Sequence, residues 1–192
     1  MGPVSCKAPS GMSADPDLSR QTIALVGLMG VGKTSVGKRL AAALDLPFRD
    51  ADHEVEHAAG RTIPEIFETM GEAAFREGER RVIARMLDEA PHVLATGGGA
   101  FQSLETRALI KSKAVSVWLR ADLEVLVRRV GRKDNRPLLR GKDPLEVLRG
   151  LAEVRYPFYA EADIVVDTGD TPHSVTVEAI LDALRRRKEA QA

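Results

Sequence analysis

Short apolar runs alternate along this chain with longer stretches in which apolar residues recur at helical spacing. The short runs, rich in β-branched and aliphatic residues, are residues 22–26, 47–49, 92–95, 114–119 and 164–166. In the longer stretches, one apolar face consists of Leu123, Leu126, Val127 and Val130, and another of Val177, Ile180, Leu181 and Leu184. Strands that alternate with amphipathic helices are typical of βαβ units, so the pattern predicts an α/β fold with a five-stranded parallel sheet flanked by helices.

The beginning of the chain lacks this pattern. Residues 1–20 are rich in Ser, Pro, Gly and Asp and contain few large apolar side chains, too few to offset the entropy lost on ordering. We therefore predict a disordered tail over residues 1–20 and one domain over residues 21–192. Within the domain, Thr62 with Glu65, and Asp143 with Pro144 and Glu146, are typical of helix starts.

The composition excludes several classes of function. The 192 residues include 28 Lys and Arg and 28 Asp and Glu, and this zero balance argues against a nucleic-acid partner bound mainly through positive charge. The longest apolar run, residues 22–31, is interrupted by glycine and is far shorter than the roughly 20 residues that cross a membrane, so we expect no membrane anchor. Cys6 is the only cysteine, which excludes an intrachain disulfide and favours the reducing cytoplasm.

Residues 27–34, GLMGVGKT, match the phosphate-binding pattern G-x-x-x-x-G-K-[ST]. The pattern follows the first predicted strand and precedes a helix that we expect to begin near Gly32. Glycines let successive backbone N–H groups form a nest for phosphates, which the helix N-terminus continues. We expect Lys33 to reach the β- and γ-phosphates of a nucleoside triphosphate, and Thr34 to bind Mg²⁺. The predicted nucleotide-binding residues here are Gly27, Gly30, Val31, Gly32, Lys33, Thr34 and Ser35.

Two carboxylates follow the second predicted strand. Asp50 and Asp52 are separated by one residue, and in an extended chain such side chains project to the same side. One can hold Mg²⁺ through water, while the other binds an acceptor hydroxyl and takes its proton. The plainer alternative is that Asp52 only caps a helix that begins at His53.

Two arginines are candidates for binding the acceptor. Arg76 is predicted on a helix over residues 71–87, where Glu79, three residues on, can orient the guanidinium; an exposed ion pair is the alternative. Arg155 continues an apolar helical face that includes Leu148 and Ala152, where an unpaired charge is costly, so it should have a partner. Two guanidinium groups that converge on a cleft suit a planar carboxylate.

Three consecutive glycines follow the third predicted strand, and a cluster of cations follows the fourth. Gly97, Gly98 and Gly99 allow the backbone to approach a substrate ring closely, unless they form only a flexible turn. We predict a mobile lid over about residues 131–142, because phosphoryl transfer gains from cations that close over the transferring group. A nucleic-acid patch or a solvated loop is the alternative. The cations are Arg128, Arg129, Arg132, Lys133, Arg136, Arg140 and Lys142.

Together these motifs resemble those of the shikimate kinases. The series is residues 27–34, Asp50-Ala51-Asp52, Phe75-Arg76, residues 97–99, Arg136-Pro137-Leu138-Leu139 and Arg155-Tyr156, in order, over about residues 20–187. The resemblance implies a P-loop kinase fold with the sheet order 2-3-1-4-5. It also implies transfer of the γ-phosphate of ATP, with Mg²⁺, to the 3-hydroxyl of shikimate, on the route to chorismate and the aromatic amino acids. We expect a cytoplasmic monomer.

The resemblance also implies a role for individual residues. Lys33, Asp52 and Arg136 look catalytic, with Asp52 as the candidate base and Arg136 as the lid arginine that reaches the phosphates. Arg129 resembles the arginine that stacks on adenine, and residues 167–172 would border the other side of that base. Thr34 and Asp50 resemble the metal site. The shikimate cradle would consist of Asp52, Arg76, Gly97, Gly98, Gly99 and Arg155.

Three other functions stay open at this point. A related small-molecule kinase, such as a gluconate kinase, would share the phosphate cradle without needing the arginine pair. A non-enzymatic nucleotide-binding regulator would keep Lys33 but lose the groups that bind an acceptor. Finally, residues 53–57, HEVEH, match the H-E-x-x-H pattern of zinc metalloproteases, although Ile63 stands where the longer pattern requires histidine.

Overall fold

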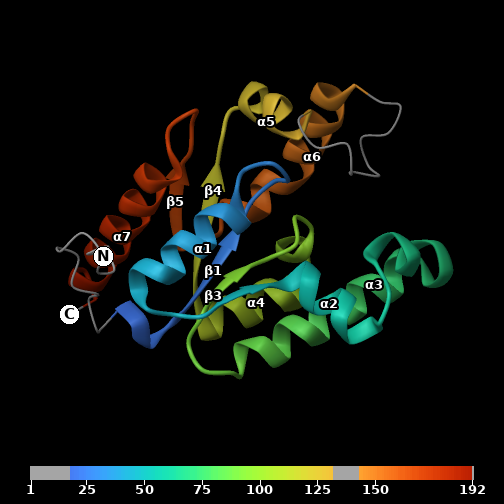
Figure 1. Ribbon diagram of the computed structural model, residues 1–192, viewed down its shortest axis with the longest axis horizontal. Helices are drawn as coiled ribbons and strands as arrows, with labels where there is room; N and C mark the ends of the chain where they lie inside the picture. The colour runs from blue at the N-terminus through green and yellow to red at the C-terminus, as the bar shows by residue number, and fades with distance from the viewer. Residues whose placement is uncertain (1–17, 132–142, 192) are drawn as a thin grey trace, which may run out of the picture.

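The computed structural model describes residues 18–131 and 143–191 (Figure 1). Residues 1–17, 132–142 and 192 lie outside the described residues, and with them most of the predicted tail and the predicted lid, including Arg136. The end of the predicted tail can be compared with the structure. Leu18–Arg20 form a short 3-10 helix, η1, whose Leu18 is buried, so the predicted boundary of the tail at residue 20 lies at least three residues too far along the chain.

Five parallel strands form a single sheet in the order β2-β3-β1-β4-β5. They are β1 (Thr22–Val26), β2 (Phe48–Asp50), β3 (Val93–Ala95), β4 (Ala114–Arg120) and β5 (Ile164–Asp167). All five residues of the central strand β1 are buried, as expected for a parallel strand that helices cover on both faces. The predicted fold class and strand order are therefore confirmed, and each strand begins within one residue of its predicted position.

Helices cover both faces of the sheet (Figure 1). Helices α1 (Lys33–Leu44) and α7 (His173–Glu189) pack against each other, while α4 (Leu104–Lys113) packs against β4 and α3 (Ile63–Leu87). The other elements are α2 (Ala51–Ala59), η2 (Ala100–Gln102), α5 (Leu123–Val130) and α6 (Pro144–Tyr159). Helices α2 and α3 extend to one side of the sheet, as Figure 1 shows. Among the described residues, no helix is both long and apolar enough to span a bilayer.

Capping residues fix where the functional helices begin. At α3 the predicted capping box is present: the Thr62 backbone N–H donates to Glu65 Oε2 at 2.7 Å, and the Glu65 N–H donates to Thr62 Oγ1 at 3.4 Å. The helix predicted from about residue 71 to residue 87 corresponds to the second part of α3, because Gly71, with a φ of 82°, is non-helical and marks a kink between this part and residues 63–70. Asp143 caps α6 through the Leu145 N–H, at 2.9 Å.

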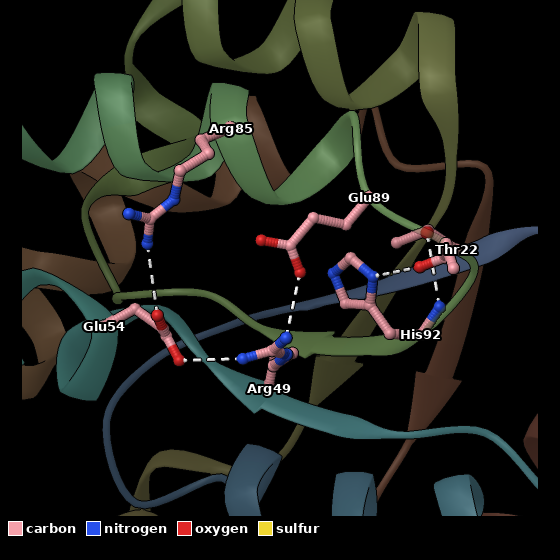
Figure 2. A network of polar contacts seen from close by, with 7 residues as sticks. Thr22, Arg49, Glu54, Arg85, Glu89 and His92 are labelled. Atoms are coloured by element: carbon pink, nitrogen blue, oxygen red, sulfur yellow. Dashed lines mark hydrogen bonds and ion pairs between the residues drawn. The ribbon is translucent and has the colours of Figure 1, made fainter.

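A chain of ion pairs joins β2, α2 and α3 on the outer edge of the sheet (Figure 2). Arg49 contacts Glu54 at 3.2 Å and Glu89 at 3.0 Å, and Arg85 contacts the second oxygen of Glu54 at 3.2 Å. Glu54 lies one helical turn from the start of α2. These contacts hold the beginning of α2 between the edge strand and the end of α3.

Candidate active site

The phosphate-binding loop leaves β1 and enters α1 through a tight bend. Gly27 has a φ of 142°, and a Cβ on it would lie 2.5 Å from the Leu119 carbonyl oxygen, so no other residue fits there. Gly32, with a φ of 99°, is the N-cap of α1. The Lys33 ammonium donates to the carbonyl oxygens of Gly27 at 2.8 Å and Leu28 at 3.1 Å. The predicted cradle thus has its lysine folded over the loop, beside the N-terminus of a helix that favours anions.

Two oxygen-bearing side chains meet beside this loop. The Thr34 hydroxyl, in the first turn of α1, donates to Asp50 Oδ2 at 2.9 Å, at the end of β2. A hydroxyl and a carboxylate are hard oxygen ligands of the kind that Mg²⁺ binds together with water and phosphate. The donor set therefore fits the ion that the sequence predicts at Thr34 and Asp50.

Helix α5 contacts two segments of the predicted nucleotide site through hydrogen bonds of Arg129. Arg129 donates to the Val31 carbonyl at 3.2 Å and to the Gly169 carbonyl, so it lies between the phosphate loop and the segment after β5. His173, which sequence reasoning missed, has its ring 3.5 Å from the position of a Cβ on Gly32. Burial, followed by the charges of Arg39 and Arg129, lowers the pKa of His173, so the ring stays neutral at pH 7 and adds no charge to the loop.

The sequence predicted that Asp50 and Asp52 lie in one extended segment. In the structure they do not, because Asp50 ends β2 and Asp52 lies in α2. Asp50 is the N-cap of α2 and accepts from the Asp52 N–H at 3.2 Å, so the alternative in which Asp52 caps the helix is also wrong. Asp52 lies in the first turn of α2 and is exposed to solvent. The surrounding protein and then the Asp50 carboxylate raise the pKa of Asp52, while Lys33 lowers it. A raised pKa makes a carboxylate a better proton acceptor near neutral pH.

Arg76 and Glu79 form the predicted pair on α3. The Arg76 Nη1 atom donates to Glu79 Oε2 at 2.8 Å, and Glu79 is only 3% exposed. The alternative of an exposed surface ion pair is therefore wrong, because the glutamate of the pair is buried. Burial raises the pKa of Glu79, and the neighbouring Arg76 opposes that rise. The other oxygen, Oε1, is buried and has no hydrogen-bond partner among the described residues.

Arg155 projects from α6 into the same site. Its residue is 8% exposed, and within the described part of the chain its Nε atom has no hydrogen-bond partner. A Cβ on Gly98 would lie 3.0 Å from Arg155 Nη1, 3.8 Å from the Gly27 carbonyl oxygen and 3.9 Å from the Met29 nitrogen. Gly98 therefore lies next to both the phosphate loop and a buried guanidinium. A guanidinium with a donor that has no partner among the described residues favours binding of an anion.

Each of the three glycines after β3 makes room for one part of this cluster. A Cβ on Gly97 would lie 2.5 Å from Glu79 Oε1 and 2.7 Å from Asp52 Oδ1, and one on Gly99 would lie 2.6 Å from both Arg76 Nη atoms. The sequence predicted that the glycines admit a substrate. The structure gives them an additional role, because any side chain there would displace the charged groups that approach this backbone.

Sequence reasoning also missed Tyr159. It lies on α6, four residues after Arg155, and its hydroxyl donates to the Gly98 carbonyl. Its side chain is completely buried, and burial raises the pKa of Tyr159 to about 12. The available signal was an aromatic residue at i+4 from Arg155, on the helical face already identified as buried.

The H-E-x-x-H pattern lies on α2, and its glutamates are already engaged. Glu54 belongs to the ion pairs of Figure 2, and Glu56 Oε1 accepts from the Ile63 N–H at 2.9 Å. Within residues 18–131 and 143–191, no three His, Cys, Asp or Glu side chains are grouped as metal ligands. The zinc alternative therefore gains no support.

Comparisons with a family model, with related sequences and with solved structures all lead to the same family. The family model described as shikimate kinase matches residues 29–185. The chain is 73% identical over 169 residues to a shikimate kinase of Caulobacter vibrioides (strain NA1000 / CB15N), covering 88% of this chain and 84% of that relative. It is 37% identical to a solved shikimate kinase from Acinetobacter baumannii in complex with shikimate, with a TM-score of 0.86 and coverage of 92% and 99%.

A more distant structure bears on the alternative kinase. A gluconokinase from Sinorhizobium meliloti 1021 has a TM-score of 0.59 at 21% identity, covering 90% of this chain and 96% of its own. At that identity the likeness concerns the fold and not the acceptor.

Proposed function

The chain belongs to the shikimate kinase family, and on that premise we propose that it phosphorylates the 3-hydroxyl of shikimate with ATP. The observation that carries the proposal is the convergence of Asp52, Arg76 and Arg155 on three glycines that adjoin the phosphate loop. A gluconate kinase shares the loop but needs no such pair of guanidinium groups. The acceptor side of the site, rather than the loop, therefore specifies shikimate.

The acceptor is held at its carboxylate and at its reacting hydroxyl. The buried guanidinium of Arg155, whose Nε atom has no hydrogen-bond partner among residues 18–131 and 143–191, binds the carboxylate together with Arg76. An ion pair between Arg76 and Glu79, at 2.8 Å, orients the Arg76 guanidinium. Asp52 binds the reacting hydroxyl and takes its proton as that oxygen bonds to the γ-phosphorus of ATP, while the bond from that phosphorus to the bridging oxygen breaks and ADP leaves. Because the raised pKa of Asp52 brings its basicity closer to neutral pH, the same carboxylate serves for orientation and for proton transfer.

The phosphoryl donor is held on the other side of Gly98. The backbone N–H groups of residues 27–32 and the N-terminus of α1 bind the phosphates, and the Lys33 ammonium moves from the carbonyls of its own loop to the β- and γ-phosphates. Thr34 and Asp50 would hold Mg²⁺, which neutralises charge on the phosphates when bound. Arg129 positions the nucleotide between the loop and the segment after β5. Catalysis then consists mainly of positioning and charge stabilisation.

A coupled assay of ADP release tests the proposal. We expect turnover that requires both shikimate and Mg²⁺, and none when shikimate is replaced by gluconate or another hydroxy acid. Phosphorylation of gluconate without phosphorylation of shikimate would assign the chain to the alternative class of kinase. Binding of ATP without turnover on any acceptor would favour a non-enzymatic regulator.

The protein is further proposed to act as a cytoplasmic monomer that binds no nucleic acid. The single cysteine supports the cytoplasmic location, and the zero net charge supports the absence of a nucleic-acid partner. Its mass in solution, measured by light scattering with and without substrates, tests the oligomeric state. A stable dimer in the presence of shikimate and ATP would contradict it.

A further inference from the structure

Tyr159 lies behind the acceptor site, in contact with backbone that the substrate also approaches. It is the last residue of α6 and its side chain is 0% exposed. Arg155 lies one helical turn earlier on the same face, because residues four apart on a helix are neighbours. A single helix face therefore presents both the carboxylate-binding guanidinium and this buried phenol.

The Tyr159 hydroxyl donates to the carbonyl oxygen of Gly98, and the Arg155 side chain is in hydrogen-bonding contact with the same hydroxyl. Burial raises the pKa of Tyr159 to about 12, so the phenol is protonated at neutral pH and acts there as a donor. A buried carbonyl that loses its donor is costly, so the hydrogen bond constrains where the Gly98 backbone lies.

Gly98 lies next to Arg155. A Cβ on Gly98 would lie 3.0 Å from Arg155 Nη1, which is a tight approach, and 3.8 Å from the Gly27 carbonyl oxygen, which is an ordinary contact distance. A shift of the Gly98 backbone therefore changes its spacing from the guanidinium first. The spacing between residues 97–99 and Arg155 thus depends on how Gly98 is held.

Packing holds the Tyr159 ring independently of its hydroxyl. The ring centroid lies 5.8 Å from that of Trp118 on β4, and Tyr156 completes the aromatic cluster at 5.1 Å from Trp118. Loss of the hydroxyl alone leaves this cluster in place. The phenol oxygen can therefore be removed without removing the side chain that supports α6 against the sheet.

We propose that Tyr159 is a positioning residue for the acceptor, whose hydroxyl holds the Gly98 carbonyl so that residues 97–99 and Arg155 keep the spacing that shikimate requires. The inference rests on the proposed function, because it concerns the acceptor of that reaction. It predicts an effect on shikimate that does not extend to ATP, whose phosphates are bound by backbone and side chains of other elements. Tyr159 itself does not touch the reacting atoms.

The test compares Tyr159→Phe with Tyr156→Phe, a matched control that removes a phenol oxygen from the same helix outside the hydrogen bond to Gly98. For Tyr159→Phe we expect the KM for shikimate to rise about fivefold to tenfold, the effect of one buried hydrogen bond. The KM for ATP and kcat should each change by less than about twofold, because the contact with the shikimate carboxylate that is weakened is made equally with bound substrate and in the transition state. Tyr156→Phe should leave all three constants unchanged.

A purely structural role would give a different result. It would lower the thermal midpoint and the fraction of active enzyme, and so kcat, while the KM for shikimate stayed at the wild-type value; that outcome overturns the inference. Equal increases in both KM values would overturn it as well. Replacement of Tyr159 by p-aminophenylalanine, which restores a donor at the same position, should return the KM for shikimate toward the wild-type value, and failure of this rescue also contradicts the inference.

The wild-type enzyme keeps this result separate from the proposed function. If wild-type protein does not phosphorylate shikimate, the proposed function fails. If it does, and Tyr159→Phe has an unaltered KM for shikimate, only the positioning role fails. Should Tyr159→Phe not fold, the p-aminophenylalanine variant decides alone: a KM for shikimate near the wild-type value supports the inference, and an increase of about tenfold with normal stability opposes it.

Discussion

The two sides of this active site are built in different ways. The donor side is continuous in sequence: residues 27–34 bend around glycines and present backbone N–H groups to phosphate, and the bend follows directly from residue types. The acceptor side brings together Asp52 from α2, Arg76 from α3 and Arg155 from α6, around a backbone that follows β3. A local motif tolerates change elsewhere in the fold, whereas an assembled site depends on every element that positions it.

Charge is also distributed differently on the two sides. On the donor side the Lys33 ammonium already has carbonyl partners at 2.8 and 3.1 Å. On the acceptor side two buried polar atoms, Glu79 Oε1 and Arg155 Nε, have no hydrogen-bond partner in the described part of the chain. A buried polar group without a hydrogen-bond partner lowers the free energy of unfolding. Such groups are retained where a ligand supplies the missing hydrogen bond. The acceptor side is thus the part of the molecule that gains most from its substrate.

The comparison predicts that variants on the acceptor side leave the binding of ATP unchanged. The largest effect on turnover is expected at Asp52, the residue closest to the reacting atoms. Asp52→Asn should reduce kcat by about 10²–10⁴, the range for loss of a general base, because the reacting hydroxyl loses its proton acceptor. The KM for ATP should stay within about twofold. Steady-state kinetics with each substrate varied in turn measure both. A near-normal kcat would remove Asp52 from the chemistry.

Arg155→Ala should act on binding more than on chemistry. Truncating one member of a buried charge pair costs about 2–5 kcal/mol, so we expect the KM for shikimate to rise by roughly 10² or more. Isothermal titration with shikimate and with ATP, carried out separately, distinguishes the two sites. A loss of ATP affinity of the same size would contradict the assignment of this guanidinium to the acceptor carboxylate.

Glu79→Gln tests the support behind Arg76 and has a pH signature. Losing the ion pair should raise the KM for shikimate about tenfold, as for a hydrogen bond to a charged group. The raised pKa of Glu79 means that its ionised form is disfavoured in the folded state, so stability is gained as pH falls through that pKa.

The thermal midpoint of Glu79→Gln should therefore exceed that of the wild type at pH 8. The difference should shrink as the pH is lowered toward the ordinary pKa of glutamate, because protonation then removes the same charge from the wild type. Melting curves of both proteins across this pH range measure the effect. A wild type that is more stable than Glu79→Gln at pH 8, and that loses this advantage as the pH falls, would show that Glu79 is stabilised as the anion.

The smallest effect is expected from the ion pairs of Figure 2, which support α2 from outside the site. Arg49 and Arg85 are 41% and 56% exposed at their side chains, and such pairs contribute about 0–1 kcal/mol each. Glu54→Gln should therefore lower the free energy of unfolding by about that amount and leave kcat within about twofold. Denaturant titration and the coupled assay measure these. A large loss of kcat would mean that α2 needs this brace to position Asp52.

Particular elements show how far the sequence could be interpreted. Residues 22–26 and 27–34 gave the central strand and the phosphate loop correctly, because alternation, glycine placement and the lysine act over a few neighbouring residues. The helix predicted from about residue 71 begins at the kink of α3, where glycine breaks the helical conformation. The shared side of Asp50 and Asp52 was wrong, because a rule for extended chain was applied across the end of β2, where α2 begins directly.

The sequence by itself determined the fold class, the strand order through its family resemblance, the phosphate loop and the identity of the charged residues, since each depends on residue type and short-range spacing. Only the tertiary structure decided which charges meet. Asp52 and Glu79 both face Gly97, Arg155 faces Gly98, and Tyr159 holds the Gly98 carbonyl. These contacts join residues far apart in the chain, and their distances are set by how α2, α3 and α6 pack around the carboxyl end of β3.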